Sequence, residues 1–133
     1  IPFLPPPANL NRIATVVLTQ ESRVCKWTLG LEIVAENYRK ERDSYKLDLR
    51  LPNGSQIELF SFPNSPERPS FPEALGLRHL AFNVESVEAV KAYLLSQGIE
   101  VEPIRVDEYT SRKFTFFSDP DGLPLELYEQ VDR

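Results

Sequence analysis

The chain has 133 residues, of which 41% are hydrophobic and 26% charged, a composition typical of one soluble globular domain. Its net charge of −5 and its scattered basic residues argue against a nucleic-acid partner. A single cysteine, Cys25, excludes an internal disulfide and a thiolate zinc cluster and favours a reducing, cytoplasmic compartment, while no apolar run approaches the ~20 residues that would span a membrane.

The first half of the chain predicts an arm followed by strands and one helix. Residues 1–9, rich in proline, are expected to form an extended arm and lack the features of a signal peptide. The elements expected after it are a strand at 12–18, a helix at 20–28, and strands at 31–39, 44–51 and 56–62. The tripeptide "PNG" at 52–54 predicts a hairpin turn. A proline-rich linker at 63–76 closes this half.

The second half of the chain repeats this pattern. The elements expected in it are a strand at 77–84, a helix at 86–98, and strands at 99–106, 112–118 and 123–130. Ser86 stands where a helix N-cap is expected, and Gly98 follows the end of the helical pattern. The tetrapeptide "DPDG" at 119–122 predicts the turn before the last strand.

The two halves match each other at a constant offset of 68 residues. The matched pairs are Gly30 with Gly98, Glu32 with Glu100, Ile33 with Val101, Pro52 with Pro120, Gly54 with Gly122, Glu58 with Glu126, Leu59 with Leu127, and Phe60 with Tyr128. So many matches in one register indicate two tandem βαβββ modules, at about residues 10–62 and 77–130, and an α+β fold.

Two matched glutamates, Glu58 and Glu126, lie between apolar residues in the middle of their strands. Strand alternation directs each carboxylate to the face opposite its apolar neighbours. That face is either plain solvent or the concave side of a curved sheet, where a pseudo-twofold axis would bring equivalent positions together. Converging carboxylates cost free energy unless a cation or a proton lies between them.

The only histidine, His79, has two possible roles. It is either a buried histidine whose ring nitrogens are satisfied by neighbours or a metal ligand. In the expected strand it shares a face with Ala81 and Asn83, which are small or polar, and this favours the ligand. One imidazole and two carboxylates suit a divalent cation such as Ni²⁺ or Zn²⁺, with Mn²⁺, Fe²⁺ and Co²⁺ as alternatives.

These motifs resemble those of a known family. The segments "RDSYKLDL", "IELFSFP", "PERPSFPEALGLRHLAF" and "FTFFSDPDGLPLELYEQ" are similar to the vicinal oxygen chelate (VOC) superfamily, which includes glyoxalase I, extradiol dioxygenases, and fosfomycin- and bleomycin-resistance proteins. Small bacterial lactoylglutathione-lyase-like proteins are the nearest in pattern, and the resemblance runs from about residue 29 to 130. It implies one domain over residues 10–133, with the two modules forming a U-shaped sheet around a metal.

The resemblance also assigns roles to residues. Glu58, His79 and Glu126 match three of the four metal ligands of glyoxalase I, with Glu126 as the catalytic base and Glu58 as a structural ligand. The fourth ligand is a first-strand histidine. The repeat offset places it at Asn11, family spacing at Leu10 or Asn11, and an alternative alignment at Thr15, and none of these is histidine.

Three functions follow as hypotheses. The first is a glyoxalase I-type lyase or isomerase, which would act on an α-hydroxy-carbonyl or hemithioacetal-like substrate through a metal-bound enediolate, with glutathione as a possible co-substrate. The second is a non-catalytic small-molecule-binding protein of the bleomycin-resistance type, favoured by the missing histidine. The third, a dioxygenase or thiol transferase, fits less well because the family's dioxygenases use two histidines.

Two further expectations concern ligands and assembly. Arg68, Arg78 and Arg105 either hold an anionic group such as a glutathione carboxylate or are simply solvated. The resemblance also implies a homodimer with the site built across the subunit interface.

Overall fold

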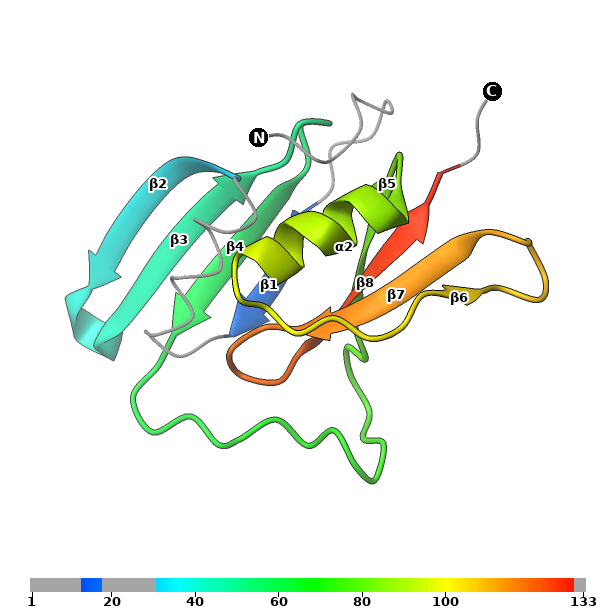
Figure 1. The fold of residues 1–133 in the computed structure, drawn as a ribbon. Coiled ribbons are helices and arrows are strands. Elements are labelled where there is room, and N and C mark those ends of the chain that lie inside the picture. Colours follow the sequence, from blue (N-terminus) through cyan, green and yellow to red (C-terminus); the bar gives the residue numbers. More distant parts are fainter. Residues whose placement is uncertain (1–12, 18–30, 131–133) are drawn as a thin grey trace. The chain divides into compact units, whose positions relative to one another are not determined.

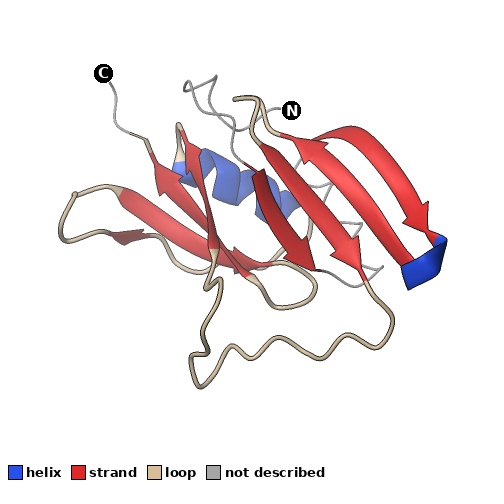
Figure 2. Ribbon diagram, turned by 180° about the vertical axis from the view of Figure 1, so that it is seen from behind, coloured by secondary structure: helices blue, strands red, loops and turns tan. Residues whose placement is uncertain are grey.

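The computed structural model describes residues 13–17 and 31–130 (Figures 1 and 2). The chain divides between Glu67 and Arg68 into two units. The first unit is Ile1–Glu67 and the second is Arg68–Arg133. The division falls inside the linker predicted at 63–76. The predicted arm at 1–9 and the predicted helix at 20–28 lie outside the described residues.

The first unit contains a four-stranded sheet. Its elements are β1 (Ile13–Val17), β2 (Glu32–Arg39), a 3₁₀ helix (Lys40–Arg42), β3 (Ser44–Arg50) and β4 (Gln56–Ser61). The strand order is β1-β4-β3-β2, in which β1 runs parallel to β4 and the other neighbours are antiparallel. The strands predicted in the first half are thus confirmed, with ends that differ by at most one residue.

Alternation along β3 and β4 gives the first sheet one apolar face. Leu47 and Leu49 are each 3% exposed and Ile57 is 6% exposed. The polar residues between them lie on the other face. The predicted turn before β4 forms around Gly54, whose φ of +85° suits a residue without Cβ.

The second unit repeats this topology. Its elements are β5 (Leu80–Val84), α2 (Val87–Ser96), β6 (Arg105–Val106), β7 (Lys113–Ser118) and β8 (Pro124–Glu129). The strand order is β5-β8-β7-β6, with β5 parallel to β8. Both sheets therefore place the strand of the predicted glutamate next to the first strand of its module, and the predicted α+β fold is confirmed.

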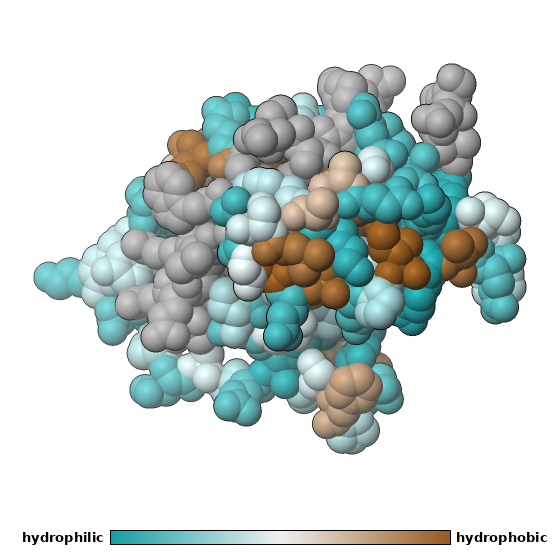
Figure 3. All heavy atoms as spheres, in the orientation of Figure 1, coloured by the Kyte–Doolittle hydropathy of each residue, from teal (hydrophilic) through white to brown (hydrophobic). Residues whose placement is uncertain are grey.

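Helix α2 covers one face of the second sheet (Figure 1). Its Val87 and Leu94 are fully buried, as is Leu127 on β8. The hydroxyl of Ser86 accepts a hydrogen bond from the Ala89 N–H at 3.1 Å, which confirms the predicted N-cap. On the face seen in Figure 3, hydrophobic side chains of this unit form separate small groups among hydrophilic ones. No helix among the described residues is long and apolar enough to cross a membrane.

Two predicted strands differ from the structure. β5 begins at Leu80, so His79 precedes the strand that was predicted at 77–84. Of the strand predicted at 99–106, only Arg105 and Val106 pair with β7. Pro103 has no N–H to donate to a ladder, which explains part of this shortening.

Candidate functional site

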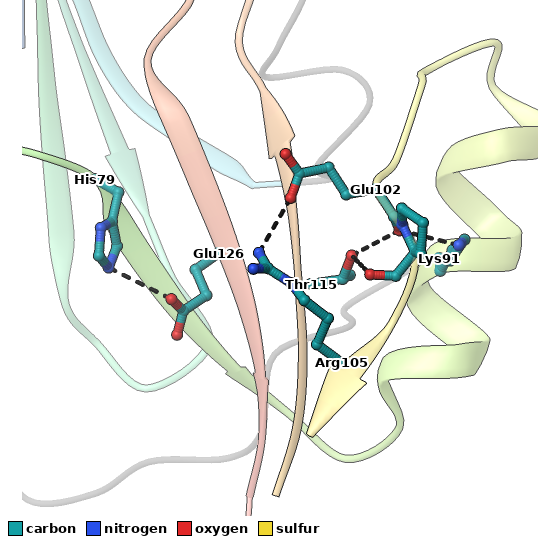
Figure 4. Close-up of polar contacts among 7 residues, drawn as sticks. His79, Lys91, Glu102, Arg105, Thr115 and Glu126 are labelled. Atoms are coloured by element: carbon teal, nitrogen blue, oxygen red, sulfur yellow. Dashed lines mark hydrogen bonds and ion pairs between the residues drawn. The ribbon is translucent and has the colours of Figure 1, made fainter. Parts of the chain in front are cut away.

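His79 and Glu126 form the centre of the candidate site, which lies wholly within the second unit. The Nε2 atom of His79 lies 3.4 Å from Oε2 of Glu126 (Figure 4). The side chain of His79 is 40% exposed and that of Glu126 only 14%. The imidazole is therefore partly exposed, which disagrees with the alternative in which His79 is a buried histidine.

The sheet register places Glu126. Leu125 and Leu127 point to the buried face of β8, so Glu126 between them points to the opposite face. On that face it pairs with Ala81 of β5 and Phe116 of β7. The ring of Phe116 meets the His79 ring edge-on, with centroids 5.2 Å apart. An aromatic neighbour thus borders the pair on the β7 side.

The surroundings of Glu126 change its acidity. Burial raises the pKa of the Glu126 carboxyl above its ordinary value, and the nearby Asp107 raises it further. His79 and Arg105 act in the opposite direction on the same pKa, but the effect of burial is larger. A carboxylate in this setting is a stronger proton acceptor than one in water.

A cavity of about 420 Å³ opens beside Glu126. It is lined by Val106, Asp107, Glu108, Tyr109, Phe114, Glu126 and Tyr128. Phe114 and Tyr128 form its apolar wall, with their rings stacked at a centroid distance of 6.4 Å. Apolar walls with a few polar groups are common in small-molecule sites, and the charged groups here are three carboxylates.

Asp107 is one of the three carboxylates that line this cavity, and sequence reasoning did not identify it. Its Oδ2 accepts a hydrogen bond from the Tyr128 hydroxyl at 2.8 Å, and its Oδ1 accepts one from the Tyr109 N–H at 2.8 Å. Both bonds lower the pKa of Asp107, and the bond from the Tyr109 N–H contributes more than the bond from the Tyr128 hydroxyl. The residue lies in the loop between β6 and β7, where a single Asp carries no periodic signal.

Arg105, expected to hold an anion or to be solvated, is already engaged. Its guanidinium lies 4.9 Å from the Phe114 ring centroid, and its Nη2 lies 3.2 Å from Oε2 of Glu102 (Figure 4). Glu102 is in turn anchored through its carbonyl, which accepts hydrogen bonds from Lys91 at 2.9 Å and Thr115 at 2.7 Å. Arg105 therefore contacts the Phe114 ring of this wall, while its side chain remains 55% exposed.

In the first unit, Glu58 has a different partner. Lys46 Nζ lies 3.3 Å from Glu58 Oε1 and 3.3 Å from Asp48 Oδ1. The hydrogen bond with Glu58 contributes most to raising the pKa of Lys46. The carboxylate predicted as a metal ligand is thus neutralised by an ammonium group of its own unit.

Two donors of the second unit have a spacing that suits both a direct ion pair and a shared divalent metal. Two donors held ~2.1 Å from a tetrahedral ion lie about 3.4 Å apart, the separation observed between His79 and Glu126. Across residues 13–17 and 31–130, no group of three or more His, Cys, Asp or Glu side chains is close enough to hold a metal ion. Glu58 belongs to the other unit, and its place in the ligand set stays a prediction.

The strand register identifies the position that corresponds to His79. Thr15 pairs with Glu58 as Ala81 pairs with Glu126, so these partners are 66 residues apart although the glutamates are 68 apart. His79 lies two residues before Ala81, and Ile13 lies two residues before Thr15. The counterpart is therefore Ile13, instead of Leu10, Asn11 or Thr15, because the first module is two residues shorter between these strands.

The sequence of this chain is similar to those of known proteins. The model of the Glyoxalase/Bleomycin resistance protein/Dioxygenase superfamily matches residues 26–127. The uncharacterized protein YaeR of Escherichia coli strain K12 is 56% identical over 118 residues, covering 89% of this chain and 91% of YaeR. The uncharacterized protein YwkD of Bacillus subtilis strain 168 is 60% identical over 102 residues, covering 77% and 80%.

A solved structure agrees with these relatives. The crystal structure of the glyoxalase family protein from Enterococcus faecalis is 50% identical to this chain, with a TM-score of 0.80. The match covers 90% of this chain and 94% of that protein. The similarity therefore extends over nearly the whole of both chains.

Proposed function

The chain belongs to the glyoxalase/bleomycin resistance protein/dioxygenase superfamily, and from this premise we propose that it is a metal-dependent protein of the glyoxalase I type. Its reaction would move a proton between adjacent carbons of a small α-hydroxy-carbonyl or hemithioacetal-like substrate. One observation supports this most: Glu126 lies both at the edge of an aromatic cavity and 3.4 Å from His79.

Each site residue has a role in this proposal. Glu126 is the base that takes the proton from one carbon and returns it to the next, because its carboxylate faces the cavity. His79 and Glu126 would hold the metal, and Glu58 is the proposed third ligand. A bound Ni²⁺ or Zn²⁺ would polarise the substrate oxygens.

The cavity walls contribute binding and shielding. Phe114 and Tyr128 provide apolar surface for the non-reacting part of the substrate. The Asp107 carboxylate fixes the Tyr128 hydroxyl at 2.8 Å and so holds this wall in place. A glutathione conjugate is the proposed first substrate, because the family resemblance implies it.

A second candidate function is binding without chemistry, as in bleomycin-resistance proteins. The register-equivalent of His79 is Ile13, so the first module offers no second imidazole. A site with fewer ligands retains metal less firmly, and the aromatic cavity alone would still hold a small molecule. A dioxygenase or a thiol transferase is the third candidate, and it lacks the second histidine that the family's dioxygenases use.

Assembly and location are part of the same proposal. A homodimer is proposed because the family resemblance implies one, and a monomeric hydrodynamic size would contradict it. The single cysteine supports a reducing, cytoplasmic location.

The test begins with metal content and proceeds to turnover. The purified protein is titrated with Ni²⁺ and Zn²⁺, and the loaded form is assayed on the hemithioacetal of methylglyoxal and glutathione. We expect stoichiometric binding, turnover, and a loss of about 10²–10⁴-fold for Glu126→Gln, since that is the usual contribution of a general base. Glu88→Gln is the matched control, because Glu88 is exposed and pairs with Lys113 on the helix side.

The outcomes separate the candidates. Stoichiometric metal with an unchanged hemithioacetal would refute the glyoxalase proposal. A melting temperature that ignores chelators, together with tight binding of an organic ligand and no product, would support the binding protein. Cleavage of a catechol or modification of fosfomycin would support the third candidate.

A further inference from the structure

The backbone that carries His79 lies outside the sheet. β5 begins at Leu80, and the ladder between β5 and β8 starts with the pair Leu80 and Leu125. His79 is therefore not fixed by any ladder pair of the described strands. A ligand or base must be held to within a fraction of an ångström to act, so another contact has to hold this backbone.

That contact is made by Arg68. Its Nη2 donates hydrogen bonds to the carbonyl oxygens of Leu77 at 2.7 Å and Arg78 at 2.8 Å. These are the two carbonyls immediately before His79. Hydrogen bonds from a charged donor are shorter and stronger than neutral ones, so Arg68 restrains the two peptide units that lead into the histidine.

Arg78 makes the reciprocal contact. Its Nη1 donates to the carbonyl of Ser70 at 3.1 Å, and its guanidinium lies 5.9 Å from the ring centroid of Phe71. The Ser70 N–H donates to the Arg68 carbonyl at 3.1 Å, which closes the segment locally. Each arginine thus binds the main chain next to the other, and we call this pair of contacts the arginine clasp.

The clasp is a structural role that the sequence did not indicate for these residues. Arg68 donates through Nη2 and Arg78 through Nη1, so each guanidinium has one nitrogen bound to main-chain carbonyls. Gly76, with φ of +117°, allows the chain to turn between the two clasped segments. These main-chain contacts give a physical reason for the two arginines of the motif "PERPSFPEALGLRHLAF".

We propose that Arg68 and Arg78 are positioning residues that fix His79 beside Glu126, an inference that rests on the proposed role of this pair as metal ligands. Loss of the clasp frees the peptide units before His79. The imidazole then samples orientations in which it and Glu126 cannot bind the same ion. The effect is on the position of the imidazole and, through it, on metal affinity.

The test uses His79 as its own probe. Because it is the only histidine, its ring gives one set of imidazole signals in the NMR spectrum of the full-length, metal-free protein. We expect Arg68→Met to shift or broaden these signals at constant pH and to weaken Zn²⁺ affinity by roughly tenfold or more, as loss of ligand-orienting partners usually does. Arg78→Met should have the same effect in a weaker form.

Two further variants make the result specific. Arg50→Met removes an exposed arginine of the other unit, paired with Glu32 at 3.7 Å, and should leave the His79 signals unchanged. Arg68→Lys keeps a charged donor and should restore part of the wild-type spectrum, and it decides the question if the methionine variant does not fold.

The outcomes distinguish the clasp from the proposed function. His79 signals that are identical in wild type, Arg68→Met and Arg68→Lys would overturn the clasp. Shifted signals in Arg68→Met, in a wild-type protein that binds no Zn²⁺, would support the clasp while refuting the metal site.

Discussion

The two units share a backbone plan but place different side chains around the equivalent glutamate. Glu58 lies opposite Asp48 on the neighbouring antiparallel strand, and Glu126 lies opposite Phe116. In the first unit Lys46, which is on β3 like Asp48, neutralises the Glu58 carboxylate at 3.3 Å. In the second unit no lysine takes that place, and burial raises the pKa of Glu126.

This contrast shows what a duplicated module preserves. The hairpin and its register fix where a mid-strand side chain lies, because pairing determines both depth and face. The neighbours on adjoining strands then decide whether that side chain is an ion-pair partner or a shielded base. The residues equivalent to Lys46 and Asp48 are Phe114 and Phe116, so an ionic surface in one unit corresponds to an aromatic wall in the other.

The largest expected effect is the loss of stability when a buried leucine is truncated in either unit, which tests whether the two apolar cores contribute equally to the free energy of unfolding. Leu94 is fully buried under the second sheet, and Leu47 is 3% exposed in the first. Leu94→Ala and Leu47→Ala should each lower the free energy of unfolding by about 2–5 kcal/mol, through lost burial and an unfilled cavity. Urea denaturation measures this. A loss below 1 kcal/mol in only one of them would break the equivalence of the cores.

The next prediction concerns the missing imidazole. Ile13→His places a second histidine at the register-equivalent of His79, and Asn11→His places it at the position given by the 68-residue offset. We expect the first variant to raise Zn²⁺ affinity by roughly tenfold or more, because even ligand-supporting partners are worth that much. Calorimetric titration decides. A stronger gain for Asn11→His would show that the offset is the better guide.

The third prediction removes the lysine that distinguishes the first unit. Lys46→Met leaves Glu58 and Asp48 without the ammonium between them, so their repulsion should lower the melting temperature by less than the core truncations do. Added Zn²⁺ should then raise the melting temperature more than in wild type. Lys113→Met is the control, since its partner Glu88 lies outside the site. An equal response of both variants to Zn²⁺ would contradict this.

The smallest expected effect is a pH dependence specific to the second unit. Hydrogen bonds from the Tyr109 N–H and the Tyr128 hydroxyl lower the pKa of Asp107 in the folded state. Its contribution to stability is therefore present above the unfolded value of about 3.9 and is lost as the pH falls through the lower folded value.

Asp107→Asn tests this sign. The stability difference between wild type and Asp107→Asn should be largest near neutral pH and shrink below about pH 4. Urea titrations at several pH values measure it, with Tyr128→Phe as a partial variant that removes one donor to the carboxylate. A difference that grows on acidification would mean that Asp107 is not stabilised as a carboxylate.

Much of the fold was predictable from the sequence because periodic patterns record local burial. Alternation along 44–51 and 123–130 predicted β3 and β8, and the cap at Ser86 predicted the start of α2. The strand at 99–106 was predicted too long, because alternation cannot show where a ladder partner ends. The start of β5 was misplaced for the same reason, which moved His79 out of the strand.

The candidate site was also only partly predictable from the sequence. Sequence reasoning selected His79 and Glu126, and the structure brings their side chains to 3.4 Å. Sequence reasoning did not find Asp107, the Lys46 ion pair or the arginine clasp. Each of these joins residues whose separation in the chain follows no fixed period.

By itself the sequence determined the two modules, the faces of their strands and the pair of equivalent glutamates, since each depends on spacing within a few residues. Only the tertiary structure decided the register that equates His79 with Ile13, because that register depends on which residues pair across the sheet. It also decided the environment of each glutamate. A carboxylate becomes an ion-pair partner or a shielded base through neighbours on other strands, and those neighbours are assembled only when the sheet forms.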